Sequence, residues 1–165
     1  MYDDTWYSQE NKRFNQQFGE ELRRLDQWEF SELEFDFLGF FSEYACVHVP
    51  DDFVVIDMGS YMGIQADYFK NCAGYIGVDV FVPVEWRFRQ ANATHYQQSI
   101  QDFIKDTLPT LGLDLNKVIA ICSYVPDQEA QYLVAETFPY HRVVYCDDII
   151  SERLPGDEWA LEDER

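Results

Sequence analysis

The second part of the chain alternates short apolar runs with turn-forming residues and amphipathic segments. Short runs rich in β-branched and aromatic residues predict buried strands, whereas apolar positions three and four residues apart predict helices. The expected strands cover residues 53–56, 75–78, 94–97, 118–122 and 142–146, and the expected helices follow Gly63, follow Ser99 and cover residues 127–137. Strands that alternate with helices predict an α/β fold with a mainly parallel sheet, here of about five strands.

The first fifty residues follow a helical pattern without strands. Phe14, Phe18, Leu22 and Leu25 recur at helical spacing, and a second apolar set does so over residues 30–41. Two N-terminal helices are therefore expected. Their apolar faces would pack on the sheet or on a second copy of the chain, which makes a homo-oligomer one expected assembly.

The end of the chain is acidic and has few apolar residues. This composition predicts a mobile tail over residues 151–165. The pattern predicts no hairpin after Cys146. The expected organisation is a helical extension over residues 1–50, a sheet-forming domain over residues 51–150, and the tail.

The turn after the first predicted strand carries the most specific pattern. The run 53–56 ends on Asp57, Gly59 and Gly63 follow, and the run 75–78 ends on a second carboxylate, Asp79. Glycine lets a backbone take unusual dihedral angles and approach a ligand closely, because it has no Cβ. A strand, a glycine turn, a helix, a second strand and an acid are together typical of the nucleotide-binding half of a doubly wound fold.

The same residues resemble the first two motifs of the class I S-adenosylmethionine (SAM)-dependent methyltransferases. The first motif runs acid-x-G-x-G-x-G; Asp57, Gly59 and Gly63 match it in register, and Tyr61 replaces the middle glycine. A dinucleotide fold would require G-x-G-x-x-G, which this turn lacks. The resemblance covers roughly residues 51–147 and implies a Rossmann-like three-layer sandwich with SAM as cofactor. That family's sheet has seven strands, the last two forming an antiparallel hairpin, so a trimmed member is expected.

The resemblance also implies which residues hold the cofactor. The turn that contains Asp57, Gly59, Ser60 and Gly63 would lie against its methionine end. Asp79 would receive both ribose hydroxyls, because a carboxylate only accepts hydrogen bonds and can take two at once.

The residues after the third predicted strand would cover the adenine. By position, Ser99 would supply a polar contact and Ile100 an apolar lid. The family has an acid where Ser99 stands, and Asp102 is the alternative candidate for that acid.

Catalytic residues are harder to place. Tyr124 follows the fourth predicted strand and is the candidate to line the site of methyl transfer; packing on the sheet at a helix entry is the commoner role for such a residue. Glu85 and Asp127 are more distant candidates for a base. Residues 123–126 do not match the acid/Asn-Pro-Pro-aromatic signature of amino-group methyltransferases, so methylation of an amino nitrogen is not supported.

Composition limits the partners. The chain has 31 acidic and 12 basic residues and a net charge of −19, which repels phosphate backbones, so a nucleic-acid partner is not expected. Its four cysteines form no C-x-x-C pair, so no metal site is predicted, and buried reduced thiols are expected.

The start of the chain lacks the pattern of a signal peptide and no apolar run is long enough to cross a membrane; together these features predict a cytoplasmic protein.

Three hypotheses for the function remain. The first is a SAM-dependent methyltransferase that acts on a small molecule or a protein. The second is a catalytically inactive relative that keeps the fold and serves as a binding or oligomerisation module. The third is an interaction module that uses the N-terminal helices. Binding of SAM would separate the first two from the third, and turnover would separate the first from the second.

Overall fold

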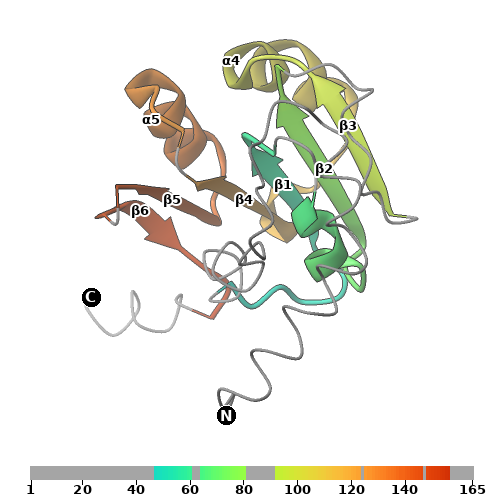
Figure 1. Ribbon diagram of the computed structural model, residues 1–165. Coiled ribbons are helices and arrows are strands. Elements are labelled where there is room, and N and C mark those ends of the chain that lie inside the picture. Colours follow the sequence, from blue (N-terminus) through green and yellow to red (C-terminus); the bar gives the residue numbers. More distant parts are fainter. Residues whose placement is uncertain (1–46, 61–63, 81–91, 124, 147, 157–165) are drawn as a thin grey trace, which may run out of the picture. The chain divides into compact units, whose positions relative to one another are not determined.

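The computed structural model describes residues 47–60, 64–80, 92–123, 125–146 and 148–156 (Figure 1). The chain divides into two compact units, Met1–Cys46 and Val47–Arg165, and all described residues belong to the second. The two expected N-terminal helices therefore lie outside the described residues, as do Tyr61, Gly63, Glu85 and Tyr124.

Six strands of the second unit form one sheet in the order β3-β2-β1-β4-β5-β6 (Figure 1). Strands β1 to β5 run parallel to their neighbours, and β6 runs antiparallel to β5. The strands are β1 Val54–Met58, β2 Gly74–Asp79, β3 Ala93–Gln97, β4 Val118–Ser123, β5 His141–Tyr145 and β6 Asp148–Arg153. The sheet is thus mixed and mostly parallel, and the fold is broadly α/β, as the pattern predicted.

One face of the sheet forms the main hydrophobic core. Because side chains alternate along a strand, Ile56 and Met58 of β1 share this face with Ala120 and Cys122 of β4. The face is covered by helix α5, Gln128–Thr137, and by a second helical segment. That segment consists of three consecutive pieces, α4 Ile100–Asp102, η4 Phe103–Thr107 and η5 Leu108–Thr110.

The opposite face of the sheet carries η2, a 3₁₀ helix over Ile64–Phe69. The ring of Phe69 stacks on Tyr75 of β2 with 5.8 Å between the ring centroids. Tyr75 is fully buried, as are Val55 of β1 and Ile119 of β4 on the same side. The helix that the sequence predicts after Gly63 is present, but in this short 3₁₀ form.

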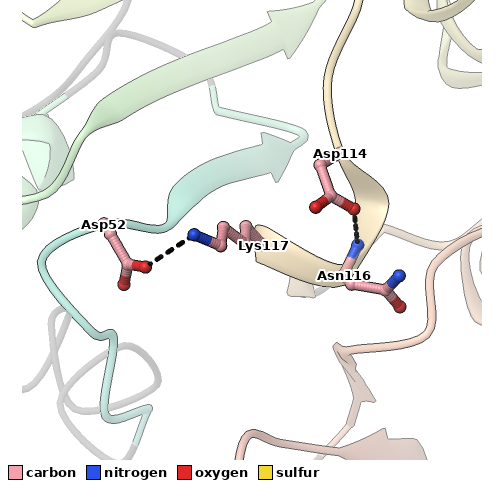
Figure 2. A network of polar contacts seen from close by, with 4 residues as sticks. All are labelled: Asp52, Asp114, Asn116 and Lys117. Carbon is pink, nitrogen blue, oxygen red and sulfur yellow. Dashed lines mark hydrogen bonds and ion pairs between the residues drawn. The ribbon is translucent and has the colours of Figure 1, made fainter.

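The amino ends of the central strands are held together at their own edge of the sheet. Asp52, just before β1, forms an ion pair of 3.2 Å with Lys117, just before β4 (Figure 2). Asp114 caps η6, Leu115–Lys117, by accepting a hydrogen bond of 3.0 Å from the backbone N–H of Asn116. Both charged side chains of the ion pair are more than half exposed, so it orients the chain more than it stabilises the fold.

The sixth strand corrects the prediction. β5 and β6 form an antiparallel hairpin, where no hairpin was expected, and residues 151–153 belong to β6 and not to the tail. Across this pair, Arg142 forms an ion pair with Glu152. Most β6 side chains are exposed, so the strand lacks the apolar alternation by which strands are recognised in a sequence.

The described cysteines agree only in part with the expectation of buried thiols. Cys122 is buried in β4, whereas Cys72 is half-buried and Cys146 is exposed. Among the helices that the structure describes, none is long and apolar enough to cross a membrane.

Candidate functional site

A pocket of about 390 Å³ lies at the carboxyl ends of the parallel strands. Its volume is within the range of sites for small molecules and cofactors, roughly 300–1,000 Å³. It sits where the strand order changes direction, because β1 is flanked by β2 on one side and by β4 on the other. Open parallel sheets bind ligands at this point. Its lining consists of Gly59, Val78, Asp79, Val80, Gln98, Ser99, Ile100, Gln101, Ser123, Val125, Pro126, Asp127 and Ala130.

The strand order determines the sequence of groups across the pocket. Ser99 and Ile100 follow β3, Asp79 ends β2, Gly59 follows β1, and Val125 follows β4. These strands are consecutive neighbours in the sheet. The groups therefore lie in a row that begins at Ser99 after β3 and ends at Val125 in the β4–α5 loop. The structure thereby brings together four of the residues that the sequence nominated for the cofactor.

Gly59 is required by the backbone as well as by the space around it. Its φ is +86°, a conformation in which a side chain is strained. A Cβ at this position would come within 2.8 Å of Cγ2 of Val125. The backbone N–H groups of Gly59 and Ser60 both donate to the carbonyl of Val78, at 2.8 and 3.2 Å, which fixes the turn against β2.

The charges at the pocket are negative. Asp79 and Asp127 line it, and no Lys, Arg or His is among its described lining residues. A hydrogen bond of 2.8 Å from Gln101 Nε2 lowers the pKa of Asp127, and a second one from the backbone N–H of Ala130 adds to this effect. Asp127 is therefore ionised at neutral pH. A site with this charge favours hydroxyl groups and cations over phosphate.

Asp57, the first acid of the motif, lies under the turn and outside the pocket lining. It is fully buried and accepts hydrogen bonds from the Tyr75 hydroxyl and from Nε2 of Gln65. Burial raises its pKa to about 6, against the effect of these two hydrogen bonds, and the charge of Asp79 adds to the rise. Gln65 also donates to the carbonyl of Ser60 at 2.9 Å, so Asp57 and Gln65 together support the turn from below.

The two residues proposed for the adenine end are both at the pocket. Ser99 caps α4, where its hydroxyl oxygen accepts a hydrogen bond of 3.1 Å from the backbone N–H of Asp102. Ile100 is buried in the core while also lining the pocket. The alternative acid, Asp102, is exposed and does not line the pocket.

Ser60 is buried and, like Asp57, is not part of the pocket lining. Gly63, Tyr124 and Glu85 lie outside the residues described. Two groups that the sequence did not nominate for binding, Gln98 and Gln101, also line the pocket. Their position after β3 was the available signal, because every residue that follows a parallel strand lies at this edge.

The lining residues suit binding better than acid–base chemistry. Asp79 can hold vicinal hydroxyls, the apolar side chains can flank a flat ring, and the glutamines and Ser99 can pair with its polar edge. Asp127 is a weak base because its pKa is lowered. The Cys122 thiol is not a nucleophile either, since burial, with the charges of Asp57 and Asp127, raises its pKa to about 12. Within the described ranges, no group of three or more His, Cys, Asp and Glu side chains is arranged to hold a metal ion.

Comparisons of the chain with protein-family models, with curated proteins and with solved structures found no match.

Proposed function

We propose that the chain binds SAM, or its demethylated product S-adenosylhomocysteine, in the pocket at the switch point of the sheet, and acts as a methyltransferase of Rossmann-like, three-layer architecture. The observation that carries the proposal is the pocket itself. Gly59, Asp79, Ser99 and Ile100, which are far apart in the sequence, line one cavity in the order that a nucleoside requires.

The polar groups favour a nucleoside over a dinucleotide. A pyrophosphate is usually bound by the N-terminus of a regular helix and by basic groups. Here the helix that the structure describes between β1 and β2 is a six-residue 3₁₀ helix, and the lining includes two carboxylates. Two hydroxyls of a ribose are a better match for Asp79.

SAM supplies an electrophilic methyl group when it is bound. The contribution of this chain would be to bind the nucleoside at Asp79, to flank the base with Ile100 and Val80, and to exclude water from the cavity. Such positioning can supply much of the acceleration of a two-substrate reaction. The methyl acceptor would be a small molecule or a protein, and a nucleic acid remains disfavoured by the net charge of −19.

A catalytically inactive binding protein is the second candidate. It is favoured by the absence of an effective general base among the described pocket residues, since Asp127 has a lowered pKa. Only an acceptor that needs no deprotonation by the protein would react in such a site. Release of S-adenosylhomocysteine from SAM in the presence of small-molecule and protein acceptors distinguishes the two candidates.

The first prediction is that S-adenosylhomocysteine stabilises the protein through Asp79. A ligand at a hundred times its dissociation constant adds about 2.7 kcal/mol to the free energy of unfolding, which corresponds to a rise in Tm of roughly 5–10 °C for a domain of this size. Thermal melting with and without ligand measures this shift. Asp79→Ala should remove most of it.

Asp106→Ala is the matched control, because Asp106 is an exposed carboxylate outside the pocket and its loss changes the net charge equally. This variant should retain the parent's shift. A parent protein whose Tm does not respond to millimolar ligand would refute the proposed function.

A further inference from the structure

Val125 occupies the space that Gly59 leaves open. A glycine at the end of β1 is expected to make room for a ligand, yet the missing Cβ would point at Cγ2 of Val125, only 2.8 Å away. Val125 belongs to the loop between β4 and α5. Its side chain therefore reaches from this loop to the glycine turn after β1 and covers Gly59.

The backbone of Val125 is anchored in this position. Its carbonyl accepts a hydrogen bond of 2.6 Å from Nε2 of Gln131, a residue of α5 whose exposed fraction is 3%. Pro126 follows directly and restricts the backbone of Val125, and Asp127 then caps α5. Because the loop is attached to the helix at both points, Val125 cannot move away from the glycine turn without breaking the partly buried hydrogen bond to Gln131.

The order of the lining residues, from Ser99 and Ile100 through Asp79 to Gly59, determines which part of a bound nucleoside lies next to Val125. With the ribose at Asp79 and the base toward Ser99 and Ile100, the 5′ substituent of a nucleoside points over β1 and β4. That direction leads to Gly59 and Val125. A small 5′ group fits beside the valine, whereas a longer substituent must pass the place where its methyl group stands.

We propose that Val125 is a specificity-determining residue: it makes the pocket prefer nucleosides with a short 5′ substituent and weakens, without preventing, the binding of the amino-acid tail of SAM and S-adenosylhomocysteine. This inference rests on the proposed function, because it assumes that a nucleoside binds with its ribose at Asp79. It adds that the preferred ligands are nucleosides with a short apolar group at the 5′ position. The probe for this class is 5′-methylthioadenosine.

Calorimetric titration of the unmodified protein gives the first test. It should bind 5′-methylthioadenosine more tightly than S-adenosylhomocysteine by about tenfold or more. The two ligands share the nucleoside and the sulfur and differ in the amino-acid tail. Equal affinities, or a preference for S-adenosylhomocysteine, would overturn the inference.

Variants of Val125 give the second test. Val125→Ala should tighten the binding of S-adenosylhomocysteine relative to adenosine by about tenfold, while the affinity for adenosine changes by less than about threefold. Val125→Thr keeps the branched shape and should keep the parent's ratio. Val80→Ala removes the same two methyl groups from another valine of the lining and should also leave the ratio unchanged.

The outcomes separate this inference from the proposed function. If adenosine binds and the ratio is the same in the parent and in Val125→Ala, the restriction by Val125 is wrong while the nucleoside site stands. A change of ratio in Val80→Ala as large as in Val125→Ala also overturns it, because the effect would then belong to any loss of methyl groups. If no nucleoside binds to any of these proteins, both proposals fail.

Discussion

Asp57 is a carboxylate held away from water by the residues that support the glycine turn. Burial is the main reason why its pKa rises from 3.8 to about 6. Because the folded protein holds this proton more tightly than the unfolded chain does, protonation stabilises the fold. That contribution is fully present below the unfolded pKa and is lost as the pH rises through 6.

The pH dependence of stability should therefore contain a contribution from Asp57. The shift from 3.8 to about 6 corresponds to a loss of about 3 kcal/mol across that range. Asp57→Asn has a similar shape and cannot titrate, so the free energy of unfolding of the parent should fall relative to this variant as the pH rises. Urea unfolding of both proteins from pH 3 to 7.5 measures the difference in their free energies of unfolding. The contributions of the other acids, which the two proteins share, largely cancel in this difference.

Tyr75→Phe provides a check on the cause. The Tyr75 hydrogen bond lowers the pKa of Asp57, so its loss should move the midpoint of the pH dependence upward. Parallel pH profiles of the parent and Asp57→Asn would contradict the assignment.

Single residues also show where sequence reasoning ends. Gly59 and Asp79 could be nominated for the site because each directly follows, or ends, a predicted parallel strand. The position of Asp57 beneath the turn depends on which face of β1 it occupies and on Gln65 and Tyr75, which come from two other elements. The contact of Val125 with Gly59 depends on packing between loops 66 residues apart in the chain, and no local pattern reveals it.

At the scale of elements, all five predicted strands are present, within one or two residues at each end. The central strands β1, β2 and β4 were recognisable because they contain apolar runs, as is typical of parallel strands that are buried on both faces. Helix α5 was recognisable from its apolar spacing, and Asp127, at the start of the predicted range, caps it. β6 was missed because it is an edge strand with mostly exposed side chains and pairs with only one neighbour.

The β5–β6 turn carries a conformational strain that can be tested. Cys146 has a φ of +51°, a left-handed conformation that costs most residues about 1–2 kcal/mol and that asparagine tolerates better. Cys146→Asn should therefore raise the free energy of unfolding by about 1 kcal/mol. Urea unfolding under reducing conditions measures the change.

Cys146→Ser is the control for this prediction, since it removes the exposed thiol without favouring a positive φ. It should leave the stability nearly unchanged. An equal gain in both variants would show that the thiol, and not the backbone, is responsible.

At the scale of the whole molecule, the net charge of −19 creates a negative potential that attracts cationic ligands to the pocket. The pocket adds two carboxylates to this field and no basic group from the described residues. SAM and S-adenosylhomocysteine have nearly the same shape, but the sulfonium gives SAM one more positive charge. The field should therefore favour SAM, and salt should weaken that preference by screening it.

The last prediction compares the two ligands as the ionic strength rises from about 0.01 M to about 1 M, over which the Debye length falls from about 30 Å to about 3 Å. The affinity for SAM should fall by about threefold or more relative to that for S-adenosylhomocysteine.

Asp127→Asn keeps a capping side chain for α5 and should reduce the preference for SAM at low salt more than Asp106→Asn does, although both remove one charge. Equal effects of the two variants would assign the preference to the net charge alone, and a parallel salt dependence of both ligands would show that the acidic field does not reach the sulfonium.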